Sequence, residues 1–184
     1  MKRWLLATVL LVGCGQSVTD YFPLKVGTKW TYEVTIDNVV EVIDITVAER
    51  APVGEYDGFL LTSAMGDSRL AWNGDVLLAA ELAGTRYSPP IPIFAEANTG
   101  WSGVVQTEGV QVAGTATLSV ESDTIENAGR DFETVVCVLN LESGDEALQL
   151  RTWYYPGLGI LRQEQRSGRT LERDRKIDFV SGPD

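Results

Sequence analysis

The stretch 21-YFPLKVGTKWTYEVTID-37 indicates how the chain folds. In its second half, apolar side chains alternate with polar ones, so that Trp30, Tyr32, Val34 and Ile36 share one side. A period of two in a run rich in aromatic and β-branched residues is typical of a strand with one buried face. We therefore predict that this strand opens the folded body and that these four side chains begin its core.

Similar runs recur along the chain, separated by turn signals such as Asp37-Asn38, Gly66-Asp67 and Asn73-Gly74. The run 77-LLAAELAG-84 could form a helical turn or two instead of a strand. We find no convincing amphipathic helix and about ten to eleven short strands, a pattern that predicts an antiparallel all-β domain. The prediction is a single, strongly curved sheet or half-open barrel over residues 21–180, with a closed barrel as the alternative, followed by a frayed tail at 181–184.

Two segments depart from simple alternation. The segment 88-SPPIPIF-94 holds three prolines, which lack the N–H donors of a strand ladder, so we predict an irregular segment extending to Thr99. It could pack across one end of the sheet or act as a lid. In contrast, Phe132 to Leu141 is apolar on both faces in its middle, which predicts a central strand covered on both sides.

The composition excludes several classes of function. The chain has no histidine, so Ser-His-Asp, Cys-His and histidine-based metal sites are ruled out. With 26 acidic and 15 basic residues and a net charge of −11, it also offers a poor surface for nucleic acid. Acidic residues that lie close together in the sequence, Asp123 with Glu126 and Asp145 with Glu146, lack the spacing of a calcium-binding loop. We predict no metal, no cofactor and no enzymatic activity.

The N-terminus, 1-MKRWLLATVLLVGCG-15, carries two basic residues followed by an apolar run. The run is shorter than the roughly 20 residues of a membrane-spanning helix and fits a signal peptide over residues 1–13. Residues 11–14 (LVGC) resemble the lipobox of bacterial lipoproteins. The resemblance implies acylation of Cys14, for example with palmitate, and a lipidated tether over residues 14–20. Gly15 in place of Asp implies sorting to the outer membrane, facing the periplasm. An ordinary signal peptide or a buried strand are the alternatives.

If Cys14 carries lipid, the second cysteine, Cys137, has no disulfide partner in the chain. It lies in the apolar run 131-DFETVVCVLNL-141, where a cysteine usually packs as a small hydrophobe. A catalytic thiol needs a base or a positive charge nearby, and the sequence supplies no histidine. We predict that Cys137 is part of the core.

Three phrases carry a wider resemblance: YFPLKVGTKWTYEV (residues 21–34), GRDFETVVCV (129–138) and WYYPGLGILRQE (153–164). They resemble a broad group of uncharacterised bacterial lipoproteins. That group is thought to be related to the lipoprotein-carrier (LolA/LolB-type) half-barrel, which holds acyl chains in a concave apolar face. The helices that cover such a half-barrel are not evident in this sequence.

Aromatic residues are the candidates for a binding surface. We nominate Trp72, Phe94, Trp101 and Tyr154 for a ligand or partner surface, with core packing as the alternative. The expected function is a lipid-anchored envelope module that binds a hydrophobic ligand or an envelope protein, or serves as a scaffold. The alternatives are a structural envelope lipoprotein without a small-molecule ligand and, third, a hydrolytic enzyme that works without histidine.

Overall fold

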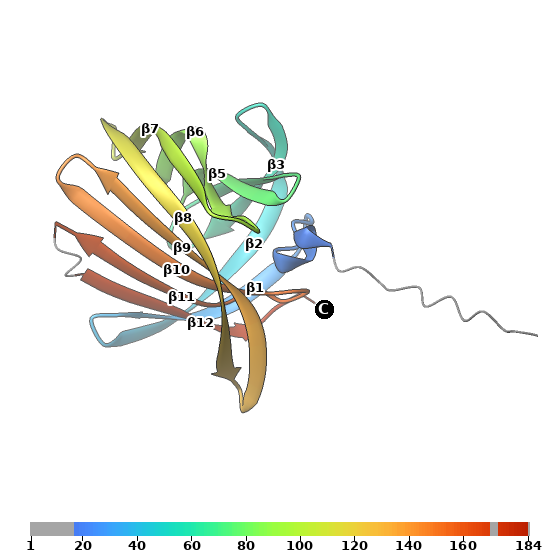
Figure 1. The fold of residues 1–184 in the computed structure, drawn as a ribbon. Helices are drawn as coiled ribbons and strands as arrows, with labels where there is room; N and C mark the ends of the chain where they lie inside the picture. The colour runs from blue at the N-terminus through green and yellow to red at the C-terminus, as the bar shows by residue number, and fades with distance from the viewer. Residues whose placement is uncertain (1–16, 170–172, 184) are drawn as a thin grey trace, which may run out of the picture.

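The computed structural model describes residues 17–169 and 173–183 and shows a closed antiparallel barrel of twelve strands (Figure 1). Each strand pairs with its neighbours in the sequence, and β1 closes the barrel against β12. The strands are β1 (Lys29–Ile36), β2 (Val39–Val53), β3 (Tyr56–Ser63), β4 (Ser68–Asn73), β5 (Val76–Leu82), β6 (Thr85–Phe94), β7 (Thr99–Thr107), β8 (Val110–Asn127), β9 (Arg130–Ser143), β10 (Glu146–Tyr155), β11 (Gly159–Gly168) and β12 (Arg173–Ser181).

The antiparallel all-β class is confirmed, but the half-open sheet of about ten to eleven strands is wrong. Closure depends on the pairing of the first and last strands, which runs from Thr31↔Ser181 to Ile36↔Arg175. This pairing removes the two free sheet edges and satisfies their backbone N–H and C=O groups. The alternation within each strand cannot reveal it, because the two strands lie about 140 residues apart in the sequence.

The simple topology gives the barrel two distinct ends. The turns that follow β1, β3, β5, β7 and β9 lie at one end, which we call the hairpin end. The other end, here the N-terminal end, carries the 3-10 helix η1 (Val18–Tyr21), the β10–β11 turn and the last residues of β12 (Figure 1). Within the described ranges, no helix is long and apolar enough to cross a membrane.

The predicted turn at Asp37-Asn38 is confirmed, since both residues have positive φ, at 48° and 65°. Two positive φ angles in succession match the two-residue hairpin turns that fit the twist of β-strands. The core residues of β1 are also confirmed up to Val34, which is buried. Ile36 is an exception: it is 39% exposed, because β1 ends there, at the hairpin end of the barrel.

The irregular segment predicted from Ser88 to Thr99 is largely wrong. Strand β6 runs through the prolines to Phe94, and only residues 95–98 lie outside strands. The ladder between β6 and β7 stops at Ser88, so the prolines beyond it have no β7 partner that requires an N–H donor. On the other side, β6 pairs with β5 through a ladder with two register shifts. The run 77–84 accordingly forms β5 and its turn, and no helix.

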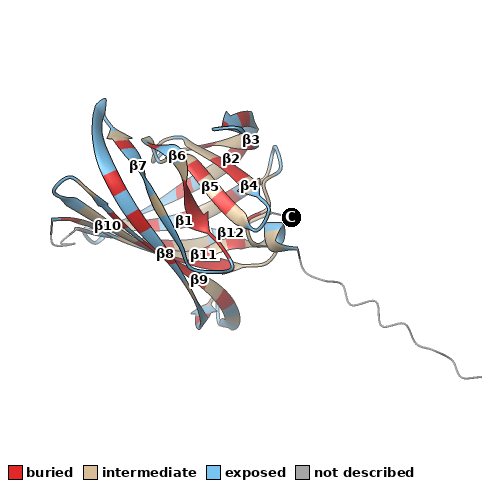
Figure 2. Ribbon diagram, turned by 45° about the horizontal axis from the view of Figure 1, so that its top comes forward, coloured by how far each residue is buried: buried red, intermediate tan, exposed pale blue. Residues whose placement is uncertain are grey.

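Buried positions alternate with exposed ones along the strands, as Figure 2 shows in red and pale blue for β8. The main apolar cluster occupies much of the barrel interior, and a second, smaller cluster of Ile125, Val136, Trp153 and Leu161 packs separately from it. In β9, Val136 belongs to the second cluster and its neighbour Cys137 to the first, and both are buried. The prediction of a central strand covered on both sides is confirmed.

Candidate binding site

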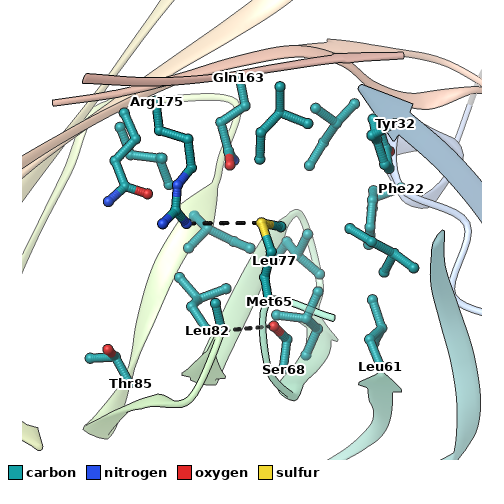
Figure 3. Close-up of a pocket in the computed structure, with 18 of the residues that line it drawn as sticks. Phe22, Tyr32, Leu61, Met65, Ser68, Leu77, Leu82, Thr85, Gln163 and Arg175 are labelled. Atoms are coloured by element: carbon teal, nitrogen blue, oxygen red, sulfur yellow. Dashed lines mark hydrogen bonds between the residues drawn. The ribbon is translucent and has the colours of Figure 1, made fainter. Parts of the chain in front are cut away.

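The barrel encloses a cavity of about 340 Å³ (Figure 3). Its walls are mostly apolar, and they come from β1 to β6 and β10 to β12, with no lining residue among those described in β7, β8 or β9. Toward the N-terminal end it is lined by buried side chains, among them Phe22, Tyr32, Leu61, Leu77, Ile93 and Tyr154. Toward the hairpin end it is lined by less buried and more polar side chains, among them Met65, Ser68, Thr85, Gln163, Gln165 and Arg175.

A cluster of aromatic side chains closes the cavity toward the N-terminal end. Phe22 stacks on Trp30, with ring centroids 4.8 Å apart and an interplanar angle of 7°. Tyr21 packs on Phe94 at 5.1 Å, and the Trp72 indole N–H donates to the Phe22 carbonyl at 3.1 Å. The segment YFPL begins at the last residue of η1 and places the rings of Tyr21 and Phe22 in this end of the barrel. We call the set Tyr21, Phe22, Trp30, Trp72, Phe94 and Tyr154 the aromatic plug.

The turn between β10 and β11 holds the aromatic plug in place. The Trp30 indole N–H donates to the Leu158 carbonyl at 2.8 Å, and the Gly157 N–H donates to the Asp20 carbonyl at 2.7 Å. Gly159 has a φ of +88°, and a Cβ there would lie 3.2 Å from Phe22 and 3.0 Å from the Trp30 indole nitrogen. Two of the sequence phrases, YFPL and PGLG, thus meet in space to seal one end of the barrel.

Two tyrosine hydroxyls lie deep in the cavity wall. The Tyr154 hydroxyl donates to the Ile93 carbonyl at 3.2 Å. The Tyr32 hydroxyl is fully buried and has no hydrogen-bond partner among the described residues. Leaving a buried polar group unpaired costs about 1–3 kcal/mol, and because this oxygen has almost no accessible surface, it offers no donor to a ligand in the cavity. Burial raises the pKa of both tyrosines far above the usual range, so both stay neutral.

The hairpin end of the cavity carries the polar groups. Arg175 reaches in from β12, and its Nη1 lies 3.8 Å from the Met65 sulfur (Figure 3). Gln163 and Gln165 come from the neighbouring β11, and Gln165 is the register partner of Arg175. Ser68 is already engaged, because its Oγ accepts a hydrogen bond from the Ala83 N–H at 3.0 Å. This end therefore combines a guanidinium with two carboxamides.

The structure brings three of the four nominated residues together. Trp72 and Tyr154 both pack edge-on against Phe94, at 5.5 Å and 5.0 Å, within the aromatic plug. Trp101 lies apart from them, against Tyr87, and donates to the Pro89 carbonyl at 2.9 Å. Among the four, Tyr154 lines the cavity. A ligand or partner surface at these residues stays a prediction.

The residues that sequence reasoning missed are Gln163, Gln165 and Arg175. A signal was present, since Arg175 stands two positions before the buried Ile177 and so shares its face of the strand. Exposed turns and strand ends carry many such polar residues, and only barrel closure places these three around one cavity. Among the described residues no group of three or more acidic or cysteine side chains is arranged to hold a metal ion.

Of the two cysteines, Cys14 lies outside the described residues, and Cys137 is a free, buried thiol. Burial raises the pKa of Cys137 to about 11, and its sulfur lies 3.9 Å from the Ala95 carbonyl oxygen. The prediction that Cys137 packs in the core is confirmed. A thiol with so high a pKa holds little thiolate at neutral pH, so it is a poor nucleophile.

The same burial predicts that the protein loses stability in alkali. The pKa of Tyr87 is raised to about 12, alongside that of Cys137 at about 11. In the unfolded chain such groups ionise near pH 8.5 and 10, so above about pH 8 the unfolded state releases protons that the folded state keeps. The free energy of unfolding should therefore be level below about pH 8 and fall as pH rises, which urea unfolding at pH 7 and pH 11 measures. Tyr87→Phe should reduce the fall by about 1 kcal/mol; an equal fall would contradict the assignment.

No protein-family model matches this chain, and neither does any curated protein sequence. Solved structures do match. An exported protein with a YmcC-like fold from Bacteroides fragilis has a TM-score of 0.50 at 12% identity, covering 89% of this chain and 98% of its own. A predicted lipoprotein from Parabacteroides distasonis has a TM-score of 0.49 at 13% identity, covering 88% of this chain and 97% of its own. The hypothetical lipoprotein YmcC from Escherichia coli scores 0.43 at 13% identity, covering 86% and 89%. At such identities, the likeness to the Bacteroides fragilis protein shows the fold alone.

Proposed function

We propose that this protein is a lipid-anchored envelope module that binds a hydrophobic ligand inside its barrel. The observation that carries the proposal is the cavity of about 340 Å³ within the closed sheet. Protein interiors are normally packed to the density of organic crystals, so an open apolar space of this size is unusual in a core. Its volume falls within the roughly 300–1,000 Å³ of small-molecule sites, which are likewise mostly apolar with a few polar groups.

The orientation of the barrel supports an anchored binding module. The predicted lipid attachment at Cys14 lies four positions before Val18, where η1 begins at the N-terminal end of the barrel. Four residues span at most about 14 Å, so an anchor there would keep the aromatic plug close to the membrane. The polar hairpin end of the cavity would then face away from that membrane. A ligand would enter and leave through the hairpin end, which would face the other components of the cell envelope.

The names of the similar structures agree with an envelope location, since they are described as lipoproteins or as an exported protein. We extend this to the present chain because its N-terminus resembles a lipobox, and Gly15 favours the outer membrane. The module is proposed to act by binding and not by catalysis, because the cavity brings together hydroxyls, amides and one guanidinium without a nucleophile–base pair.

A bulky side chain in the cavity tests this function. Leu148 lines the cavity and is half-buried, so Leu148→Trp can fill the space at modest cost to folding. We expect the mature chain with Cys14→Ser to bind the uncharged fluorescent probe N-phenyl-1-naphthylamine and the Leu148→Trp variant to bind it at least about tenfold more weakly. Each buried methylene contributes about 0.8 kcal/mol, so excluding even a few carbons costs this much affinity.

The matched control is Val42→Trp, which adds the same side chain on the outer surface, where Val42 is 65% exposed. It should bind the probe like the parent chain. Equal binding by the parent chain and Leu148→Trp would contradict the proposal and favour a structural lipoprotein or one that acts through protein partners.

A further inference from the structure

The charged side chain that lines the cavity among the described residues is a cation, Arg175. We propose that the cavity selects a single-chain amphiphile with an anionic headgroup, a carboxylate or a phosphate monoester, whose headgroup binds Arg175 at the hairpin end. The apolar chain then extends between the walls toward Tyr32. This inference rests on the proposed function and names the ligand class of the same site.

Arg175 points into the cavity, and most of its N–H donors are free to bind such a headgroup. Its strand position pairs it with Ile36 on one side and Gln165 on the other, which sets its side chain on the cavity face together with Ile177. Its recorded contact is with the Met65 sulfur at 3.8 Å, a weak acceptor, and the described residues form no ion pair with it. A guanidinium has five N–H donors, so most of its capacity remains.

Two arginines on the neighbouring strand β11 differ from Arg175, because each forms an ion pair with an aspartate of β12. Arg162 lies 3.0 Å from an Asp178 carboxylate oxygen, and Arg166 lies 3.2 Å from an Asp174 carboxylate oxygen. The chain carries 26 acidic residues, so arginine partners are plentiful on its surface. Arg175 instead faces a cavity lined by neutral groups. A bound anion would supply the charged hydrogen-bond acceptor that this arginine lacks. Arginine binds planar carboxylate and phosphate groups in a bidentate manner.

Gln163 and Gln165 extend the headgroup site along β11. The Gln163 Nε2 donates to the Thr152 Oγ1 at 3.1 Å, which leaves it one N–H, and the Gln165 carboxamide has two N–H donors that can turn toward an anion beside the guanidinium. The overall net charge of −11 repels anions in general, so selectivity for an anionic headgroup has to come from these local donors. Figure 3 shows Arg175 and Gln163 on the same side of the cavity, pointing into it.

The opposite end of the cavity fixes the direction of the ligand. There the polar groups are the hydroxyls of Tyr32 and Tyr154, which are buried and neutral, and the other lining side chains are aromatic or aliphatic. An anion at that depth would lose its hydration without gaining a charged partner, which is strongly unfavourable. At the hairpin end, Arg175 and the glutamines are half-exposed, so an anion keeps part of its water. The charge therefore stays at the hairpin end and the chain goes inward.

The test compares ligands that carry different headgroups on the same dodecyl chain. Dodecanoate, dodecyl phosphate, dodecanol and dodecyltrimethylammonium are titrated below their micelle concentrations into the mature chain with Cys14→Ser, and into its Arg175→Gln and Arg166→Gln variants. Arg166 is the matched control because its ion pair with Asp174 is exposed and it does not line the cavity. We expect Arg175→Gln to weaken dodecanoate or dodecyl phosphate about tenfold or more, since a hydrogen bond to a charged group is worth about 1.5–3 kcal/mol. Dodecanol should change less than about twofold, and Arg166→Gln should leave every probe unchanged.

Each other outcome has a distinct meaning. The preferred anion of the two identifies the headgroup as carboxylate or phosphate. If Arg175→Gln weakens dodecanol as much as the anions, Arg175 shapes the cavity and the headgroup proposal is wrong. It is also wrong if the anions bind the variant as well as the parent chain, or if the ammonium probe binds best. If dodecanol and the anions all fail to bind the parent chain, the proposed function itself fails.

Discussion

Replacing Trp30 by alanine is expected to lower the free energy of unfolding by about 3–5 kcal/mol, the usual cost of removing a buried tryptophan. Trp30 is fully buried and joins three parts of the chain: its ring stacks on Phe22, its indole N–H binds the Leu158 carbonyl, and its strand closes the barrel against β12. The loss takes a large share of the 5–15 kcal/mol that typically stabilises a domain. Urea unfolding followed by far-ultraviolet circular dichroism measures it.

Trp30→Phe separates the two contributions. Phenylalanine keeps a ring against Phe22 but cannot donate to the Leu158 carbonyl, which lies 2.8 Å from the indole nitrogen. We expect a smaller loss of about 1–3 kcal/mol, the cost of an unpaired buried acceptor. If Trp30→Ala and Trp30→Phe lower the free energy of unfolding equally, ring packing in the aromatic plug does not stabilise the N-terminal end of the barrel.

The second large effect is expected from Gly58→Ala in β3. A Cβ at Gly58 would lie 2.6 Å from the Leu70 carbonyl oxygen and 2.5 Å from a Val53 methyl group. The carbonyl belongs to the neighbouring strand, so the clash can be relieved only by moving backbone. Overpacking of this kind costs about 1–3 kcal/mol, and more where backbone must shift. The measurement is the same urea unfolding.

Gly100→Ala in β7 is the matched control, because it is the same substitution in a strand of the same barrel. Its Cβ would meet nothing closer than the Ala116 carbonyl oxygen at 3.8 Å, an ordinary contact. We expect a change within about 0.5 kcal/mol, as for a typical surface substitution. A loss at Gly100 as large as at Gly58 would show that strand glycines matter here for a reason other than close approach.

Local patterns predicted much of the fold. Alternation located β1, β2, β8 and the two-faced β9, and turn dipeptides located the hairpins, because both depend on residues close in the sequence. Barrel closure stayed an open alternative, and β6 was not predicted. Closure is a contact between the two ends of the domain, and the prolines of β6 are tolerated because the β7 ladder has already ended at Ser88. Both depend on which strands are neighbours in space.

The site was predicted less well than the fold, for a related reason. Sequence reasoning nominated large aromatic residues, and Phe94 and Tyr154 are now placed in the aromatic plug. The polar residues of the hairpin end, Gln163, Gln165 and Arg175, become a group only when β11 and β12 close the cavity. A lone arginine near a C-terminus does not point to a site by itself, and an arginine facing an apolar cavity does.

Native mass spectrometry of the protein expressed with its N-terminal segment and purified from cells, compared with its Leu148→Trp variant, tests the central claim most directly. The account predicts a second population of the parent protein that is heavier by one small amphiphile per chain, and its loss in Leu148→Trp, because that side chain occupies the cavity. The Val42→Trp control should keep the bound molecule. Finding only the mass of the covalent polypeptide, or the same added mass in Leu148→Trp, would contradict binding inside the barrel.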